Sequence, residues 1–494
     1  MRLDRIHLKN YRCFEALSID LHPQLTVLVA PNGQGKTTLL DAIKVALWPY
    51  LAGFDLGSTT NDVTSIQIDD VRREQVQSHE MEWRLPSEIK AFGQLQVRQL
   101  VLAGILKIPG YAAKNLVNNG VNELSDDVPW QCVRYRDKVK KGTKTKDLAI
   151  VDALNLNVTA NALEKRIFSG DIKLPDDLPM LGYYGTGRLW AQKKLTAKHA
   201  QADAETQSRT FAYRDCLDPA SSYKHFAEWF SRIHHSYLQA QIRNLEKRLP
   251  YDADIPDGLI APFKAVQKAV DAILESHTGW HSLQYSVEYE ELVLSHNTFG
   301  QLKVSQLSDG IRNMLALAGD IAYRCYKLNA HLGEVAPRQT QGVVLIDEVD
   351  MHLHPAWQQT VLPDLMAAFP KLQFVATTHS PQVASSISSD SIRVISDGKI
   401  YAAPPGAQGA ESSRLLKRLF GVEVRPQNNV ATQELKTYLE LVYADKWDDA
   451  KAKALRQQLD NRYQDEEPAL TEADLYIENR IWESSIDEKE GDPQ

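Results

Sequence analysis

The distribution of apolar residues along the chain predicts an α/β fold with a buried sheet. Continuous apolar runs occur at Leu25–Val29, Gly342–Ile346 and Leu372–Thr378. Short runs of this kind are typical of strands that are covered on both faces. After the first run, apolar side chains recur at helical spacing from Leu39 to Leu47. The pattern therefore predicts a strand, a loop and a helix near the N-terminus, and two further buried strands in the second half of the chain.

In other segments, apolar and polar residues alternate or recur at helical spacing, which predicts half-buried strands and amphipathic helices. Alternation predicts strands at Arg5–Lys9, Ser18–Leu21, Ser65–Ile68, Gln131–Arg136 and Ser282–Leu294. Helical periodicity predicts helices at Tyr223–Leu249, Ala261–Ser276, Ala431–Ala444 and Trp447–Leu459. We therefore expect the region after Pro404 to be mostly helical.

The composition is that of a soluble globular protein. The 494 residues are 43% hydrophobic and 24% charged. No stretch approaches the roughly 18 continuous apolar residues of a membrane span. The four cysteines are far apart and form no CxxC pair, which disfavours a disulfide framework or a zinc site. Because the N-terminus has no apolar signal region, we expect a cytoplasmic protein without a membrane partner.

The net charge of −8 is unevenly distributed. Residues 465–494 contain eleven acidic and two basic side chains, so the rest of the chain carries a net charge of +1. The negative net charge thus comes from the acidic C-terminal segment, while the rest of the chain is nearly neutral. The overall charge therefore does not argue against DNA as a partner. A basic run, Lys138–Lys146, indicates either a solvated hairpin tip or a contact to a nucleic-acid backbone.

The segment Ala30–Thr38 predicts a phosphate-binding loop between a strand and a helix. Glycines let the backbone curl until several N–H groups face one anion, and the helix N-terminus adds positive charge. Lys36 would reach the β- and γ-phosphates of ATP, and the Thr37 hydroxyl would bind Mg²⁺. Ala30 takes the place of the first glycine of the consensus, which requires a negative φ. The expected nucleotide contacts in the loop are Asn32, Gly33, Gln34, Gly35, Lys36, Thr37 and Thr38.

Three further segments supply groups that ATP hydrolysis needs. Asp347 and Glu348 end an apolar strand, so Asp347 can hold the Mg²⁺ shell and Glu348 can polarise the attacking water as general base. His379 ends the next strand and can contact the γ-phosphate. Ser308–Gly310 begins a helix whose first N–H groups form a second anion site, although an ordinary N-cap is the alternative interpretation.

Together with Asn10-Tyr11-Arg12, these motifs stand in an order that resembles the ABC-type ATPases of the RecF and SMC kind. The resemblance implies an ABC-type ATPase head with a mixed sheet core, an inserted helical lobe and a C-terminal helical region. It also implies a head-to-tail dimer, in which Ser308 and Gly310 face the γ-phosphate of ATP held by the other copy. Arg12 would help to hold phosphate in its own copy. The implied parts are residues 1–190 with an insertion at about 50–180, then 191–280, 281–405 and 406–494.

A closer resemblance is to ATPases of bacterial defence systems. Asp347–Pro355 and Thr378–Pro381 are similar to the overcoming-lysogenization group, and Tyr183–Trp190 and Arg214–Leu217 are similar to the PtuA-type ATPase of Septu and of retrons that contain Septu genes. The resemblance implies an antiphage ATPase that uses ATP and Mg²⁺ and controls an HNH nuclease of the PtuB type. It implies a homodimer or an oligomer of dimers. In a retron, a reverse transcriptase and its RNA–DNA hybrid would join the complex.

The chain also departs from these families at several points. The glutamine that links the nucleotide to the helical lobe is not obvious, and Gln192 is the candidate. The ninety residues after Pro404 lack the acidic set of a metal-binding nuclease domain, so we expect no nuclease site in this chain. Asp350, His352 and His354 are compatible with a metal site or with a positioning role beside the nucleotide. The alternative functions are a RecF/SMC-like DNA-repair clamp without a nuclease and the ATPase subunit of a transporter.

Overall fold

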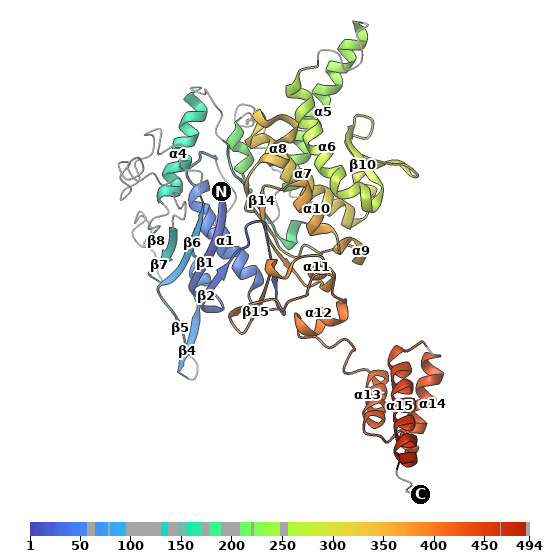
Figure 1. The fold of residues 1–494 in the computed structure, drawn as a ribbon. Helices are drawn as coiled ribbons and strands as arrows, with labels where there is room; N and C mark the ends of the chain where they lie inside the picture. Colours follow the sequence, from blue (N-terminus) through green and yellow to red (C-terminus); the bar gives the residue numbers. More distant parts are fainter. Residues whose placement is uncertain are drawn as a thin grey trace. The chain divides into compact units, whose positions relative to one another are not determined.

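The structure, a computed structural model, divides into two compact units. It describes residues 1–56, 65–77, 80–94, 130–136, 148–149, 154–169, 177–188, 208–218, 222–247, 255–464 and 466–490. The first unit is Met1–Phe420 and the second is Gly421–Gln494. Figure 1 draws both units with their helices and strands.

The core of the first unit is a six-stranded sheet, most of which is parallel. Its strands are β3 (Leu25–Val29), β9 (Met180–Tyr184), β13 (Gly342–Ile346), β14 (Leu372–Thr378), β15 (Ile392–Ser396) and β16 (Lys399–Ala402). The order is β16-β15-β3-β14-β13-β9, and only β15 and β16 pair antiparallel. Every residue of β3, β13 and β14 is buried. The three buried strands expected from the apolar runs are therefore confirmed, as is the α/β class with a mixed sheet.

A second, antiparallel sheet is formed by the N-terminal strands together with strands from the expected insertion. Its strands are β1 (Arg2–Tyr11), β2 (Phe14–Asp20), β6 (Ser87–Gln94), β7 (Trp130–Arg134) and β8 (Leu148–Ala149). The order β2-β1-β6-β7-β8 places β1 between β2 and β6. Part of residues 50–180 thus completes the N-terminal sheet. A separate hairpin joins β4 (Arg73–Gln77) to β5 (Glu80–Trp83).

The strand expected at Ser65–Ile68 is wrong. The chain there enters a short 3-10 helix, η1 (Ile68–Asp70). The carboxylate of Asp70 accepts a hydrogen bond from the Gln67 backbone N–H at 2.9 Å, which caps this turn. Alternation alone could not predict this outcome, because the side chain of Asp70 competes locally for the backbone donors.

Helix α1 (Lys36–Leu51) connects the two sheets. It packs against β14 of the first sheet and against β6 and β7 of the second. The indole Nε1 of Trp130 donates to the carbonyl oxygen of Ala46 at 2.8 Å, which fixes α1 on β7. Helix α4 (Leu154–Ser169) also packs on α1. The helix that follows the phosphate loop is therefore held on several sides, which keeps its N-terminus in place.

A helical lobe surrounds α7 (Asp309–Leu328), the helix that begins at the Ser308–Gly310 segment. Figure 1 shows α7 beside α5 (Ser222–Glu246) and α6 (Asp257–Thr278), and both helices contact it. A Cβ on Gly319 of α7 would lie 2.6 Å from the ring of Phe226 on α5, which indicates close helix packing. The single strand expected at Ser282–Leu294 is wrong, because two strands and a turn occupy it. The three-stranded sheet here consists of β10 (Trp280–Ser286), β11 (Glu291–His296) and β12 (Gly300–Lys303).

Several short helices complete the first unit. They are α8 (Ala336–Gln339), α9 (Pro355–Gln358), α10 (Val361–Ala368), α11 (Pro381–Ser385) and α12 (Ser412–Arg418), with 3-10 helices η2 (Thr186–Arg188), η5 (Arg209–Tyr213), η6 (Val304–Gln306), η7 (Ala330–Val335) and η8 (Ser389–Ser391). Helix α12 places Leu415 in the large core of the first unit, and Leu419 and Phe420 follow it there. The expected division of the head into three parts stays a prediction.

The C-terminal unit is a bundle of three helices with a core of its own. The helices are α13 (Val430–Tyr443), α14 (Ala450–Tyr463) and α15 (Pro468–Glu490). Their buried side chains include Leu435, Val442, Leu459 and Leu470. Ion pairs join α15 to the rest of the unit through Arg456 and Asp474 and through Arg480 and Asp445. None of the described helices is long and apolar enough to cross a membrane.

We expect Leu459→Ala to destabilise the C-terminal unit alone. Leu459 is fully buried in that core, and truncation of a buried leucine costs about 2–5 kcal/mol. Calorimetry of the full chain should show a lower transition temperature for the C-terminal unit and no change for the first unit. Lys453→Ala, at an exposed position of the same helix, is the matched control. A shift of both transitions by Leu459→Ala would contradict separate folding.

Candidate functional site

The segment Ala30–Thr38 forms a loop between β3 and α1 whose shape depends on two glycines. Gly33 and Gly35 have φ values of 80° and 94°, in the left-handed region that favours glycine. Gly35 is the N-cap of α1 and supplies no side chain to its first N–H groups, which leaves them to face an anion. Ala30 is fully buried and is not among the described residues with positive φ, so it meets the condition set by the sequence.

Lys36 lies across this loop. Its ammonium donates to the carbonyl oxygens of Ala30 at 2.8 Å and Pro31 at 3.3 Å. Burial lowers the pKa of the Lys36 ammonium, and the nearby carboxylates of Asp347 and Glu348 oppose this shift. Lys36 therefore stands between the loop and the acidic end of β13, where a phosphate group could exchange with the two carbonyls.

Asp347 and Thr37, the two predicted metal ligands, are in direct contact. The Thr37 hydroxyl donates to Oδ2 of Asp347 at 3.0 Å, although 310 residues separate them. The other carboxylate oxygen accepts from the hydroxyl of Thr377 at 2.6 Å. Oxygen atoms of carboxylates and hydroxyls are the ligands that Mg²⁺ prefers. The Asp347 side chain is buried beside the loop. These two residues therefore fit a Mg²⁺ ion bound with a nucleotide phosphate.

Glu348 and His379 stand at the same end of the sheet. Glu348 follows β13 with a φ of 49°, and its backbone N–H donates to the Thr377 hydroxyl at 2.7 Å. His379 directly follows β14 and is half-buried. Thr377 thus orients both Asp347 and the backbone of Glu348. Sequence reasoning missed this role, although a threonine near the end of the neighbouring strand was the available signal.

Arg12 lies between β1 and β2 and contacts two carboxylates. Its Nη1 donates to Asp41 on α1 at 2.6 Å, and its Nε donates to Asp70 at 2.8 Å. Asp41 also pairs with Lys44 of α1. Arg12, Asp41 and Lys44 therefore form an ion network on α1. Sequence reasoning missed both acidic partners, because they are distant in the chain. The predicted phosphate contact of Arg12 stays a prediction.

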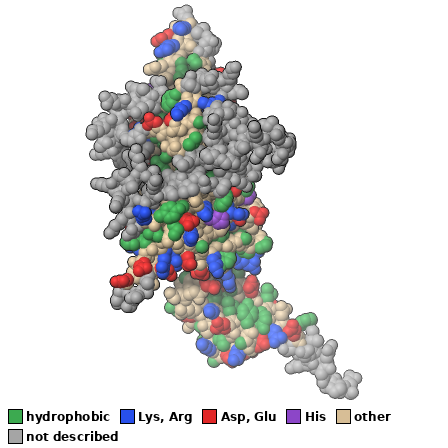
Figure 2. Space-filling view, turned by 90° about the vertical axis from the view of Figure 1, so that its left-hand side faces the viewer, with side chains coloured by type: hydrophobic (Ala, Val, Ile, Leu, Met, Phe, Trp, Pro, Cys, Tyr) green, Lys and Arg blue, Asp and Glu red, His purple; other side chains and the backbone are tan. Residues whose placement is uncertain are grey.

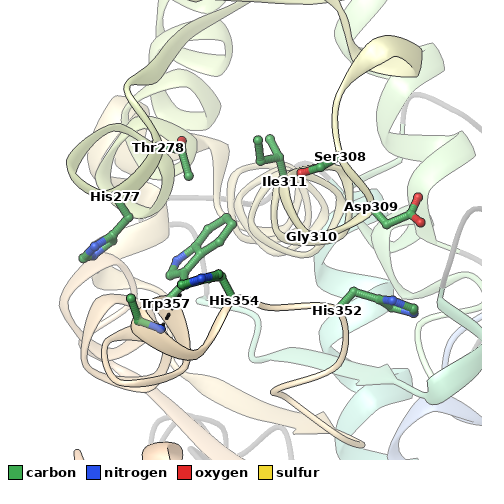
Figure 3. A pocket seen from close by; sticks show the side chains of 10 residues that line it. His277, Thr278, Ser308, Asp309, Gly310, Ile311, His352, His354 and Trp357 are labelled. Carbon is green, nitrogen blue, oxygen red and sulfur yellow. Dashed lines mark hydrogen bonds between the residues drawn. The ribbon is translucent and has the colours of Figure 1, made fainter.

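Ser308 and Gly310 open α7 beside a pocket of about 420 Å³. Ser308 is the N-cap, is exposed and makes no side-chain cap hydrogen bond. Gly310 lies so close to the carbonyl oxygen of His352 that a Cβ would approach it to 2.6 Å. Figure 3 shows Ser308 and Ile311 at the helix start, with Trp357 and His354 across the pocket. No residue of the phosphate loop lines this pocket, so the pocket beside Ser308 is separate from that loop.

The remaining candidates have structural partners or lie outside the described residues. Asp350 accepts a hydrogen bond from the Thr378 hydroxyl at 2.6 Å, and Nδ1 of His354 accepts from the Ala356 N–H at 3.3 Å. Within the described ranges, no group of three or more His, Cys, Asp or Glu side chains could hold a metal ion. Gln192 and Lys138–Lys146 lie outside the described residues.

Comparison with known proteins defines the class. Residues 5–250 match a family described as "AAA domain", and residues 230–385 match one described as "AAA domain, putative AbiEii toxin, Type IV TA system". The chain therefore contains AAA-type ATPase domains. Its relatives include the retron Ec83 probable ATPase of Escherichia coli, which is 28% identical over 99% of this chain and 88% of the relative.

Further relatives support the expected resemblance to ATPases of retron and Septu systems, which is confirmed. The retron Vc95 probable ATPase of Vibrio cholerae is 23% identical over 80% of this chain and 74% of the relative. Septu protein PtuA of Bacillus mycoides is 33% identical, over 28% of this chain and 17% of its own length.

Among solved structures, an Smc head bound to the winged-helix domain of ScpA is 15% identical to this chain. The match covers 81% of this chain and 98% of that structure, with a TM-score of 0.44.

We expect Gly35→Ala to impair nucleotide binding more than Gly33→Ala. Both substitutions place a side chain at positive φ, which costs about 1–2 kcal/mol. A Cβ on Gly35 would also lie 2.5 Å from the Phe14 ring and 2.7 Å from Sγ of Cys13, whereas nothing lies within 4 Å of one on Gly33. Calorimetric titration with ATP should give an affinity about tenfold weaker for Gly35→Ala than for Gly33→Ala. Equal affinities would contradict the role of this close contact.

Proposed function

We propose that this chain is the ATP-binding and ATP-hydrolysing subunit of a bacterial antiphage defence complex of the Septu or retron type. The contact between Thr37 and Asp347 carries the proposal, because it joins the phosphate loop to the acidic strand end at one point. Similarity to a retron ATPase over 99% of the chain supports the defence setting. The complex acts in the cytoplasm.

In this proposal the residues act on ATP in defined roles. The backbone N–H groups of the loop and Lys36 bind the phosphates, and Arg12 supports them. Thr37 and Asp347 hold Mg²⁺, which neutralises charge on the transferred phosphoryl group. Glu348 polarises the attacking water, and His379 contacts the γ-phosphate. The nuclease site is assigned to a partner chain.

The proposed ATPase works as a head-to-tail dimer. Ser308 and Gly310 of one copy close over ATP that the loop of the other copy holds. Ser308 is exposed and makes no side-chain cap hydrogen bond, and it lines a pocket at the N-terminus of α7. These features support the arrangement, because no residue of the chain's own phosphate loop lines that pocket. Closure would change the affinity for a partner, since a nucleotide shifts an equilibrium only through differential binding.

The proposed partner is an HNH nuclease of the PtuB type, which docks on the C-terminal unit. That unit exposes large apolar side chains, among them Val430, Tyr443, Leu475 and Ile481, and Figure 2 shows hydrophobic side chains on its surface. A groove of about 570 Å³ runs along α13 and is lined by Leu435, Leu439 and Tyr443. In a retron, the reverse transcriptase and its RNA–DNA hybrid join the same complex.

The alternative function is a RecF-like clamp on DNA. A RecF protein of Lactococcus lactis is 49% identical over 9% of this chain, which is the observation in its favour. On the face shown in Figure 2, however, the described Lys and Arg side chains are interspersed with Asp and Glu. ATPase activity measured with and without DNA separates the two functions, because a clamp requires DNA binding and stimulation by DNA.

Glu348→Gln should retain ATP binding and lose turnover. The amide keeps the shape of the side chain but cannot accept the proton from water, so we expect kcat to fall about 10²–10⁴-fold. The dimer should then persist with ATP, which size-exclusion chromatography with light scattering would detect. Glu334→Gln, an exposed position of the first unit, is the control. Normal hydrolysis by Glu348→Gln would show that Glu348 is not the base.

Lys36→Ala should abolish nucleotide binding and defence together. Loss of the ammonium removes the cation that faces the phosphates, so we expect ATP affinity to fall about 100-fold or more. Plaque assays with the complete gene system should show loss of phage protection, whereas Lys371→Ala, at an exposed position, should protect normally. Protection by the Lys36→Ala variant would mean that ATP is dispensable for defence.

A further inference from the structure

A buried polar cluster joins the sheet to the helix that carries Ser308 and Gly310. The Tyr184 hydroxyl donates to Oδ2 of Asp320 on α7 at 2.8 Å, and Nε of Arg324 donates to the same oxygen at 2.7 Å. All three side chains are at most 2% exposed. Burial and the Asp320 carboxylate raise the pKa of Tyr184 well above its usual value, so the hydroxyl stays a donor.

Arg324 extends this cluster to a third element. Its Nη1 donates to the carbonyl oxygens of Ala212 and Arg214, at the end of η5. Breaking this buried ion pair would leave a buried charge without its partner. Oδ1 of Asp320 is buried and has no hydrogen-bond partner among the described residues. Oδ2 of Asp320 thus joins Tyr184 of β9 to Arg324, which in turn contacts η5.

Tyr184 also contacts the proposed metal site through its backbone. It is the last residue of β9 and pairs with Ile346 of β13. Its carbonyl oxygen accepts a hydrogen bond from the Asp347 N–H at 2.8 Å. One residue therefore contacts the proposed Mg²⁺ ligand at its carbonyl and helix α7 at its hydroxyl.

Helix α7 is long and buried enough to transmit a displacement. Asp320 lies eleven residues after Asp309, or about 16 Å along the helix axis. Most of the side chains between them are buried, and close packing of this kind would transmit a displacement along the helix. A tilt imposed at Ser308 consequently shifts Asp320, and the shift acts on the Tyr184 hydroxyl.

We infer that Tyr184 is a positioning residue that couples helix α7 to Asp347 of the same chain. The inference rests on the proposed function, because in the head-to-tail dimer α7 serves one ATP site and Asp347 serves the other. Closure of α7 over the partner's nucleotide would thereby align Asp347 for the chain's own nucleotide. The two ATP sites are then linked through Tyr184 and Asp320, and ATP hydrolysis is positively cooperative.

Tyr184→Phe tests this coupling, because it deletes only the hydroxyl. We expect cooperativity to be lost, with a Hill coefficient for ATP near 1, and kcat to fall about tenfold with KM changed less than about twofold. Tyr213→Phe is the matched control, since it deletes another buried hydroxyl, which donates to the Pro179 carbonyl at 2.7 Å. It should keep the wild-type Hill coefficient and a similar kcat.

Three outcomes would overturn the coupling. They are a wild-type chain that hydrolyses ATP without cooperativity, a Tyr184→Phe variant with unchanged kcat and Hill coefficient, and an equal loss in Tyr213→Phe. The last outcome would show that any buried hydroxyl in this region acts through stability alone. A wild-type chain without ATPase activity would instead overturn the proposed function.

Amide hydrogen exchange tests the coupling in chains that keep Tyr184. It therefore also applies if the Tyr184→Phe chain does not fold or if the wild-type chain has no ATPase activity. ATP and Mg²⁺ should protect the peptide that contains the Asp347 amide in the wild-type chain. In Ser308→Arg, which obstructs the partner's nucleotide at α7, protection of that peptide should be weaker while that of the phosphate loop is retained. Equal protection of the Asp347 peptide in both chains would overturn the coupling.

Discussion

The parallel pairing of β3, β14 and β13 determines where each residue of the nucleotide site lies. The carboxyl ends of parallel strands meet at one edge of a sheet, so the segments that follow these strands converge there. Thr37, Asp347 and His379 reach this edge from three distant parts of the chain. Thr377, on the central strand of the three, then holds the Asp347 carboxylate and the Glu348 amide. A shift of one residue in this register would turn Thr377 to the opposite face.

The buried strands and the phosphate loop could be predicted from the sequence because their signals are local. A continuous apolar run specifies a covered strand whatever its neighbours are, and the glycines of the loop are needed for its own backbone. Asp347 could also be placed beside Thr37, since both follow strands of one sheet. Helix α7 was predicted to begin at Ser308 for a similar reason, namely a polar cap before a long apolar pattern.

Interactions that depend on distant partners could not be predicted in this way. Arg12 shares Asp41 with Lys44 and also contacts Asp70, and none of these contacts follows from spacing along the chain. The strand expected at Ser65–Ile68 fails because the carboxylate of Asp70 caps a turn there. The hydroxyl of Tyr184 donates to a carboxylate 136 residues away, a contact that no local pattern indicates. The contacts of Arg12 and Tyr184 are set by strand register and helix placement, whereas the Asp70 cap is a local contact between residues three positions apart.

The two carbonyl contacts of Lys36 have a consequence for the way the loop meets its ligand. The carbonyl oxygens of Ala30 and Pro31 accept hydrogen bonds from the Lys36 ammonium, so this group has partners within the loop itself. A phosphate that binds Lys36 would take the place of these carbonyls as hydrogen-bond acceptor, which would require little ordering of the loop. ATP binding would then lack the large negative heat-capacity change of coupled folding and binding. The association rate of ATP with the loop would be set by diffusion and charge and not by a slow rearrangement of the chain.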